Sequence, residues 1–337
     1  MIGSLSLIRR FAIPALLAAC AASAQTLDVY NIDVEGGKAT LYVSPSGQSM
    51  LVDAGYGGNN GRDAERIVAV AKAAGLKRID WLVVTHYHQD HAGGVEPLAA
   101  RFPIGTFVDH GPSSDLGKNI EPAYSSYQRE AKKHRHITAK PGETIPIAGI
   151  EVRIATADGK AVAKPLPGGG QSNASCAKYR AIETDTGENA HSIGMLITYG
   201  AFRLADLGDL HWNQEHDLAC PVNKVGPVDV YITTHHGTKT SGSPQMVWAL
   251  HPKVAIMDNG AFKGGSQEAW QTIHDSPGLL DLWQLHYSPD RGERRNPPFD
   301  FIANVDEKCK GAWIKLSARA DGTFMVENGR NGFKKGY

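Results

Sequence analysis

The stretch Thr85-His86-Tyr87-His88-Gln89-Asp90-His91 follows directly on Trp81–Val84, a compact apolar run that is typical of a buried strand. The side chains in it that can coordinate a metal are His86, His88, Asp90 and His91. In α/β folds the catalytic and binding residues usually lie in loops that follow strands. Imidazole nitrogens and a carboxylate at this spacing can serve two adjacent divalent ions, so the stretch predicts a metal site.

The segments before this loop predict short strands and one amphipathic helix. Strands are expected at Leu27–Val34, Ala39–Val43 and Met50–Val52, which are separated by turns rich in Gly, Pro and Ser. Apolar residues recur at helical spacing over Asp63–Ala74, and Gly75 is expected to end that helix.

A second α/β half is expected after the loop. Its strands are predicted at Ile150–Ile154, Ile193–Thr198, Phe202–Ala205, Val228–Thr233 and Val254–Met257, and its helices at Gln245–Leu250 and Gln267–His274. The polar, Gly- and Pro-rich segment Ala157–Ala190 has the length of a functional lid or a disordered loop. Two β-rich halves with helices and no visible linker predict one domain over residues 25–337, an α/β protein built as a layered αββα sandwich.

Composition narrows the class of protein. The chain has 337 residues, of which 42% are hydrophobic and 21% charged, and this excludes a disordered chain. The one long apolar stretch lies at the N-terminus and is short for a bilayer span, which excludes a polytopic membrane protein. Residues 1–24 hold two arginines and no acid, so without them 33 basic residues face 35 acidic ones. Such a chain has no overall field that would collect nucleic acid.

Residues 1–24 are expected to be an export signal, so the protein is expected to be periplasmic or secreted. Arg9 and Arg10 close a basic region, Phe11–Ala19 is apolar, and Ala22-Ser23-Ala24 supplies an A-x-A cleavage site. Three alternatives stay open: a lipoprotein acylated at Cys20, twin-arginine export, and an uncleaved anchor. For a chain whose signal is cleaved, membrane attachment is expected only if Cys20 is lipidated.

Three cysteines remain after such a cleavage: Cys176, Cys220 and Cys309. An exported compartment permits disulfides. Cys176 and Cys220 each flank an expected core strand, so we expect them to pair and to restrain the 157–190 segment.

Three other stretches form a set of motifs with Thr85–His91, which we call the His-rich loop. They are Leu51-Val52-Asp53-Ala54-Gly55, Leu207-Gly208-Asp209 and Thr234-His235-His236-Gly237. Together they resemble the motifs of the metallo-β-lactamase superfamily over roughly residues 27–290. Within it the chain is most similar to the extracellular domain of competence proteins of the ComEC kind, through Asp33–Leu41 and the double histidine followed by glycine. The resemblance implies the same four-layer αββα sandwich.

The resemblance also implies the role of each motif residue. His86 and His88 would bind a first metal ion, Asp90 and His91 a second, and Asp209 would bridge the two. Either His235 or His236 would complete the second site. His235 is preferred because Thr-His after a strand repeats the arrangement at Thr85-His86, which leaves the other histidine to face the substrate. The groups expected to take part in the reaction are Asp90, Asp209 and His236.

Other residues have competing interpretations. His191 lies near the superfamily's third histidine and is either a ligand of the first metal or a loop imidazole. Asp53 is expected to hold the His-rich loop by hydrogen bonds, or else to be a turn residue. His286 either points to the site or is a satisfied buried histidine. The remaining histidines are interpreted as structural or solvated: His110, His134, His136, His211, His216, His251 and His274.

The chain departs from the competence proteins at two places. Their Gly-Gln-Gly-Asp is Glu35-Gly36-Gly37-Lys38 here, and their Tyr-Gly-His-Pro region is Lys263-Gly264-Gly265-Ser266. The basic runs are also short and scattered, so stable binding of duplex nucleic acid is not expected.

The sequence therefore predicts an exported metal-dependent hydrolase that uses a metal-bridging hydroxide. Two Zn²⁺ ions per chain are expected, with Mn²⁺ or Fe as alternatives, and the expected substrate is a small phosphoester, such as a phosphodiester. Hydrolysis of a β-lactam, lactone or thioester, an iron-dependent dioxygenase, and a catalytically silent envelope binding protein remain open. The oligomeric state is not predicted.

Overall fold

The computed structural model describes residues 25–113, 117, 120–289, 295–306 and 308–337. The expected export signal, with Cys20, lies outside these residues. Among the described residues, no helix has the length and apolar character needed to cross a membrane.

One of the two large sheets carries the N-terminal half and the C-terminal end of the chain. Its nine strands within the described residues run in the order β20-β19-β18-β1-β2-β3-β4-β5-β6. They span β1 (Leu27–Asn31), β2 (Thr40–Val43), β3 (Ser49–Val52), β4 (Ile79–Val83), β5 (Ile104–Asp109), β6 (Arg135–Thr138), β18 (Ile314–Ala318), β19 (Phe324–Asn328) and β20 (Lys334–Gly336). Strands β3 to β6 are parallel to one another.

The other large sheet is formed by the second half of the chain. Its order is β17-β16-β15-β14-β12-β11-β8-β7, with β9 paired to β8, and strands β12 to β17 in it are parallel. They span β7 (Thr144–Ile145), β8 (Glu151–Ala157), β9 (Lys160–Ala161), β11 (Gly194–Tyr199), β12 (Phe202–Asp206), β14 (Val230–Ile232), β15 (Val254–Met257), β16 (Asp281–His286) and β17 (Ile302–Asn304). A short pair, β10 (Gln171–Ser172) and β13 (Val222–Asn223), lies apart from both sheets.

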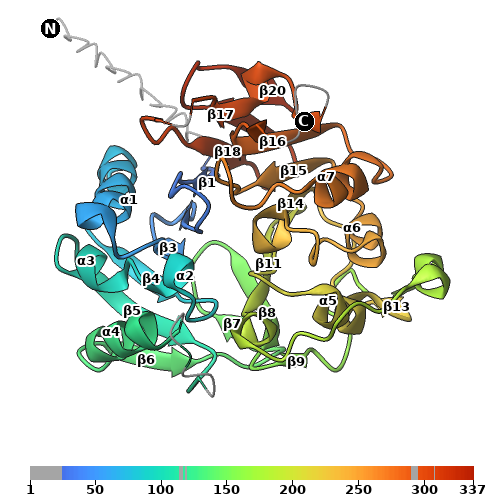
Figure 1. Ribbon diagram of the computed structural model, residues 1–337, viewed down its shortest axis with the longest axis horizontal. Helices are drawn as coiled ribbons and strands as arrows, with labels where there is room; N and C mark the ends of the chain where they lie inside the picture. Colours follow the sequence, from blue (N-terminus) through green and yellow to red (C-terminus); the bar gives the residue numbers. More distant parts are fainter. Residues whose placement is uncertain (1–24, 114–116, 118–119, 290–294, 307) are drawn as a thin grey trace, which may run out of the picture.

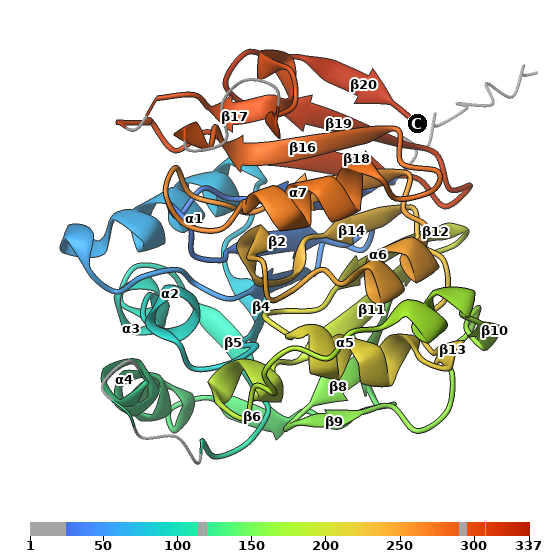
Figure 2. The ribbon, with the colours of Figure 1, turned by 45° about the vertical axis from the view of Figure 1, so that its right-hand side comes forward.

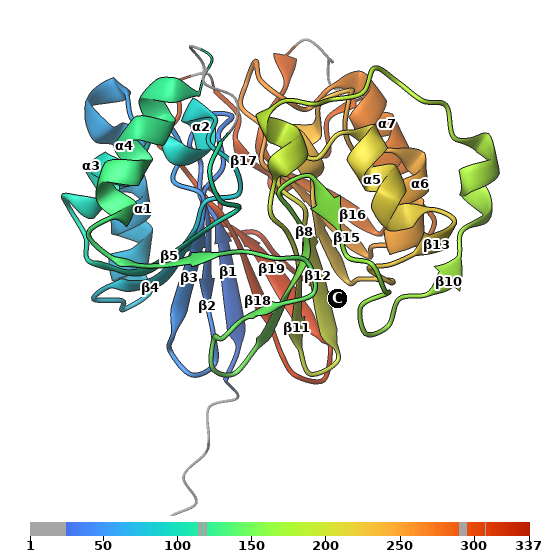
Figure 3. The same cartoon turned by 90° about the horizontal axis from the view of Figure 1, so that it is seen from below.

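Helices cover the outer face of each sheet, as Figure 3 shows. Helices α1–α4 lie against the first sheet, and α5–α7 lie against the second (Figures 1 and 3). They span α1 (Arg62–Ala73), α2 (Gln89–Ala92), α3 (Val95–Ala99), α4 (Glu121–Ala131), α5 (Trp212–Ala219), α6 (Pro244–Leu250) and α7 (Gln267–His274).

Within the described residues, three apolar cores join these layers. The largest lies between the sheets, where strand residues such as Tyr42 and Trp283 are fully buried. A second core joins the first sheet to its helices, and a third joins the second sheet to α5–α7. Successive side chains of a strand point to opposite faces, so strands covered on both sides read as continuous apolar runs. The predicted four-layer αββα sandwich is confirmed.

The C-terminal part of the chain completes the first sheet. Strand β18 pairs antiparallel with β1, so Leu27 lies opposite Ala318. Figure 2 shows β18–β20 lying beside β16 of the other sheet. No strands were expected in this region from the sequence, because a strand at the end of the chain carries no local sign of its distant partner.

The predicted long segment 157–190 is partly structured. It contains β9, β10 and two 3₁₀ turns, Ala174–Lys178 and η3 (Glu188–His191). The predicted disulfide between Cys176 and Cys220 is confirmed, with Cα atoms 5.8 Å apart, and it ties this segment to the end of α5.

The parallel strands of the two sheets bring their carboxyl ends toward the same edge. The His-rich loop follows β4, Asp209 follows β12, and η4 (Thr234–Gly237) follows β14. Ligands of open α/β sheets bind outside the carboxyl ends of the strands, so this edge positions the candidate site.

Candidate metal centre

The His-rich loop turns from β4 into helix α2. His88 precedes the first helical residue, and Asp90 and His91 lie in the first turn. The side chains of His86 and His91 are fully buried. The loop therefore holds two buried imidazole rings and, one residue before His91, the carboxylate of Asp90.

Asp53 holds this loop from β3, as predicted. Its Oδ1 accepts the Thr85 backbone N–H at 2.8 Å, and its Oδ2 accepts the Thr85 hydroxyl at 2.7 Å. The same Oδ2 lies 2.7 Å from Nδ1 of His91. A carboxylate only accepts, so Nδ1 carries a proton, and Nε2 is the atom of His91 that is left to bind a metal ion.

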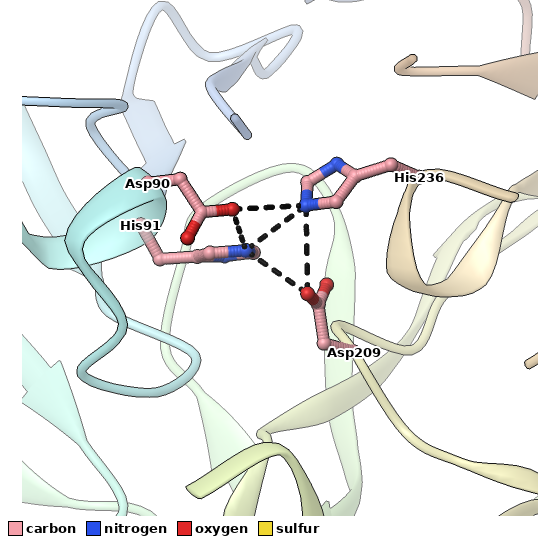
Figure 4. A group of neighbouring side chains, drawn as sticks. All are labelled: Asp90, His91, Asp209 and His236. Carbon is pink, nitrogen blue, oxygen red and sulfur yellow. Dashed lines mark hydrogen bonds and ion pairs between the residues drawn. The ribbon is translucent and has the colours of Figure 1, made fainter. Parts of the chain in front are cut away.

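Asp90, His91, Asp209 and His236 converge on one point, as Figure 4 shows. One ligand atom of each lies within 4.8 Å of the ligand atoms of the other three. Nε2 of His91 is 3.1 Å from Oδ2 of Asp209 and 3.2 Å from Nε2 of His236. Nε2 of His236 is 3.2 Å from Oδ2 of Asp90. These separations suit ligands gathered around one ion with bonds of about 2.0–2.2 Å.

Asp209 links this group to the first pair of histidines. Its Oδ2 is 3.4 Å from Nε2 of His236 and 3.9 Å from Nε2 of His86. His86 Nε2 in turn lies 2.9 Å from Nδ1 of His88. Oδ1 of Asp209 is buried and has no hydrogen-bond partner among the described residues. One carboxylate thus faces both predicted halves of a dinuclear site.

The structure reverses the expected order of the double histidine. His236, expected to face the substrate, is fully buried in the four-residue group, and its Nδ1 lies 3.3 Å from the carbonyl oxygen of Asp258. His235, the preferred ligand, lies nearer the surface, with Nε2 3.7 Å from Asp209 Oδ2 and its ring stacked on His211. Both residues have positive φ, 52° and 54°, so the chain turns sharply between their side chains.

His191 is not brought to this centre. Its Nδ1 lies 3.2 Å from Oδ1 of Asp158, and it belongs to a separate group with His110. The neighbouring Ser192 faces the centre instead. Its hydroxyl oxygen is 3.4 Å from Nδ1 of His86 and accepts the backbone N–H of Asp209 at 3.2 Å. The expectation that His191 is the third ligand of the first metal therefore finds no support in the geometry.

Burial and charge act against each other in the centre. Burial raises the pKa of Asp209, but the neighbouring imidazoles, His91 first, outweigh it and hold the pKa well below its usual range. The pKa of Asp90 is lowered in the same way. The pKa of His86 is lowered by burial and by His91, so this ring keeps a free lone pair at neutral pH.

This donor set fits divalent metal ions. Two ring nitrogens face each other at 3.2 Å, in His91 and His236, and Asp209 keeps a buried oxygen without a partner. Such groups are costly to bury unless something compensates them. Imidazole nitrogens with carboxylate oxygens are ligands that suit zinc, and they also suit iron.

Two buried charged residues that were not expected at the site from the sequence, Lys38 and Asp258, lie next to the converging ligands on the side away from the pocket. Lys38 is 1% exposed, and its ammonium lies 2.9 Å from Asp206 and 3.3 Å from Asp258. Asp258, which follows β15, faces His236 from the side away from the centre. A polar residue directly after a buried strand was the available signal for Asp258. Lys38 gave none, because buried lysines are rare.

A pocket of about 380 Å³ opens over the centre. It is lined by His88, Gln89, Asp90, Asp209, His235 and Lys263. The Lys263 ammonium contacts the Asp90 carboxylate and lies 3.2 Å from the phenol oxygen of Tyr56. The pocket rim therefore carries a cation beside the converging ligands. From the sequence, Lys263 was noted only as a departure from the competence proteins and was not expected at the site.

His286 is a satisfied buried histidine, one of the two predicted alternatives. Its Nε2 lies 2.7 Å from Oδ1 of Asp33, and both residues are at most 1% exposed. Arg66 and Cys309 contact the other oxygen of Asp33. The pair lies outside the group of converging ligands.

A comparison with known families shows which superfamily the chain resembles. Residues 32–169 match the family model described as metallo-beta-lactamase superfamily. The predicted resemblance to this superfamily is confirmed, and the chain has the metallo-β-lactamase fold. The matched residues include the His-rich loop and Asp53.

Two curated relatives show which proteins resemble the chain. It is 24% identical to Recombination protein 2 of Haemophilus influenzae over 71% of its own length and 25% of that protein's. It is 30% identical to a hydroxyacylglutathione hydrolase of Acidiphilium cryptum over 36% of its own length and 40% of that protein's. The chain thus spans a quarter to two fifths of the length of these relatives.

Among solved structures, the chain is similar to the metallo-beta-lactamase fold protein YhfI from Bacillus subtilis, with 12% identity and a TM-score of 0.47. That alignment covers 77% of this chain and 96% of YhfI. CmlA, a diiron beta-hydroxylase from Streptomyces venezuelae, aligns over 87% of this chain and 54% of its own, with 16% identity and a TM-score of 0.44.

Proposed function

We propose that this protein is a dinuclear metal-dependent hydrolase that cleaves a small anionic phosphoester. The observation that carries the proposal is the position of Asp209, whose Oδ2 lies within 3.9 Å of ring nitrogens of His86, His91, His235 and His236. His86, His88 and Asp209 would hold one ion, and Asp90, His91, His236 and Asp209 the other. Bound there, two divalent cations supply a nucleophilic hydroxide at neutral pH and neutralise the charge that develops on the substrate.

The residues around the ions orient the substrate. The Lys263 ammonium lies at the rim of the pocket, where it favours a substrate that carries negative charge. His235 lies on the same rim and can hydrogen-bond the leaving group, while Asp53 and Asp258 hold the rings of His91 and His236 in place. A phosphodiester offers the charge that Lys263 would bind, and a neutral lactone or ester does not.

The first test is turnover of bis-p-nitrophenyl phosphate by the full chain loaded with Zn²⁺ or Mn²⁺. We expect Lys263→Gln to raise KM for this diester at least tenfold and to leave KM for neutral p-nitrophenyl acetate within twofold. Lys253→Gln is the matched control, because Lys253 pairs with Asp229 away from the pocket. Equal effects of K263Q on both substrates would contradict the anionic substrate.

The same panel separates the competing reactions. A hydroxyacyl-glutathione thioester tests the activity named for one relative, and dioxygen uptake by iron-loaded protein tests the dioxygenase alternative. Plasmid DNA should be cut slowly or not at all at physiological salt, because binding duplex normally takes several phosphate contacts. Rapid, salt-sensitive cleavage of plasmid without action on the small diester would replace this proposal with a nuclease.

We also propose that the protein is exported. The Cys176–Cys220 disulfide supports this, because such bonds persist in oxidising compartments and are rare in the cytosol. Intact-mass analysis of cell fractions should find a mature N-terminus at Gln25. An acyl group on Cys20 would favour the lipoprotein form, and an unprocessed cytosolic chain with free thiols would contradict export.

A further inference from the structure

A second group of potential metal ligands lies apart from the candidate metal centre. It consists of His110, Asp158 and His191, and one ligand atom of each lies within 4.8 Å of those of the other two. Oδ1 of Asp158 is 3.2 Å from Nδ1 of His191. The residues come from the end of β5, the turn between β8 and β9, and the end of η3.

The contacts of His110 leave one of its ring nitrogens free to bind a metal ion. It is 2% exposed, and its Nε2 lies 2.8 Å from Oε1 of the buried Glu188. Because a carboxylate accepts the proton of Nε2–H, the lone pair is left on Nδ1. Among the described residues, Nδ1 has no hydrogen-bond partner. Metal-binding histidines almost always donate their other ring N–H to a carboxylate, a carbonyl oxygen or water, and a buried lone pair without a donor is uncommon otherwise.

The other two residues supply charge and access. The Asp158 side chain is 44% exposed and His191 is 23% exposed, so an ion can enter from solvent. Lys160 pairs with Oδ2 of Asp158 at 2.7 Å, which leaves Oδ1 on the side of His191. The negative charges of Asp158 and the supporting Glu188 are available to compensate a divalent cation.

We propose that His110, Asp158 and His191 bind one divalent transition-metal ion, with Zn²⁺ as the best match, separate from the dinuclear centre. Two imidazoles and one carboxylate, with a side open to solvent, form a ligand set that zinc takes in proteins. His191 then has a ligand role of its own, which accounts for its position outside the candidate metal centre.

The ion would join segments that hold the His86 side of the centre. Oε1 of Glu188, which positions His110, also accepts the backbone N–H of Tyr87 at 3.1 Å. Ser192, the residue after His191, places its hydroxyl 3.4 Å from Nδ1 of His86. Through these contacts the ion would act as a positioning element for the His-rich loop and would take no part in the reaction.

The test is zinc stoichiometry of the full chain, stripped of metal, reloaded with Zn²⁺ and measured by elemental analysis after desalting. We expect three equivalents for the wild type, and one fewer for both Asp158→Asn and His191→Ala. Asp158 is exposed, so D158N should fold even if a change at the buried His110 does not. Asp275→Asn is the matched control, because Asp275 is an exposed partner of His274 at 3.1 Å and, in the described part of the chain, the pair has no third potential ligand.

The outcomes separate this inference from the dinuclear proposal, which supplies two of the three equivalents. If the dinuclear centre does not exist, wild-type protein will still bind one equivalent that D158N and H191A lose. If D158N and H191A both keep the wild-type stoichiometry, the proposed third ion is overturned. A loss in H191A that is absent in D158N would also overturn it, because His191 would then serve the dinuclear centre.

Discussion

Replacing Asp53 by Asn should weaken metal binding although Asp53 is not itself a ligand. Its Oδ2 accepts two hydrogen bonds at 2.7 Å, from the Thr85 hydroxyl and from Nδ1–H of His91. If the Asn oxygen keeps the Thr85 backbone N–H, the new NH₂ group faces Nδ1–H of His91, and two donors meet. His91 must then shift its proton to Nε2, the atom that faces Asp209 and His236.

The size of the effect follows from these contacts. Loss of the partner that orients a ligating histidine typically weakens metal affinity about 10–100-fold, or about 1.4–2.7 kcal/mol. Losing a hydrogen bond to a buried charged group also costs folding stability of about 1.5–3 kcal/mol. We therefore expect D53N to remain folded, with a lower free energy of unfolding and zinc affinity reduced by one to two orders of magnitude.

The assay is competition for zinc against a chromophoric chelator, together with urea unfolding of the metal-free protein. Asp63→Asn is the matched control, because Asp63 is buried, accepts the backbone N–H of Tyr56 at 2.8 Å and pairs with Arg62 at 2.7 Å. Among the described residues, it belongs to no group of potential metal ligands. The control should lose comparable stability and keep its zinc affinity. If D53N is folded and binds zinc as tightly as the wild type, the assigned orientation of His91 is wrong.

Three further outcomes test other parts of the structure. Asp209→Ala should abolish both turnover and metal bound at the centre; elemental analysis that finds both at wild-type level would rule out the bridging role. The free energy of unfolding should fall by up to about 3 kcal/mol between pH 6.5 and 9, since Asp33 and a hydrogen bond with Cys309 outweigh burial and raise the pKa of His286 to about 9. The stabilisation from His286 is complete below the pKa of this residue in the unfolded state and is lost as the pH rises through its pKa in the folded state. If the free energy of unfolding of H286Q, measured with urea, depends on pH as steeply as that of the wild type, the prediction is wrong. Cys176→Ser with Cys220→Ser should cost about 4 kcal/mol by loop-closure entropy for a separation of 44 residues, measured by urea unfolding, and an unchanged midpoint would show that the bridge adds nothing.

The sequence predicted those parts of the fold that local patterns determine. Helix α7 and strand β15 have the predicted bounds, because apolar spacing and the flanking residues define both ends. Strands β18–β20 were missed, because β18 is specified by its pairing with β1 at the other end of the chain. Helix α4 was missed as well, and its buried face is partly tyrosine, Tyr124 and Tyr127, which weakens the apolar pattern.

The candidate site was predicted in composition better than in arrangement. The predicted motifs contain the residues that come together at the centre. A metal site depends on ligand types at short spacings, and these can be seen directly in the sequence. Which atom faces the centre depends instead on partners that lie far away in the chain. His191 is the example: its place before a strand suggested the centre, and Asp158, 33 residues away, holds it in another group.

The double histidine shows what the choice between neighbouring residues depends on. A non-glycine residue with positive φ is uncommon, and His235 and His236 adopt this conformation in succession. Strain of this kind persists where surrounding contacts determine the backbone. Here the backbone N–H of His235 bonds to the carbonyl of Gly208, and the carbonyl of His236 accepts the N–H of Gly265. A Cβ at Gly264 would lie 2.2 Å from that carbonyl oxygen, so glycine is needed there. Contacts from two other segments, at Gly208 and at Gly264–Gly265, thus fix the turn that buries His236 and leaves His235 at the rim. No pattern within Thr234–Gly237 contains that information.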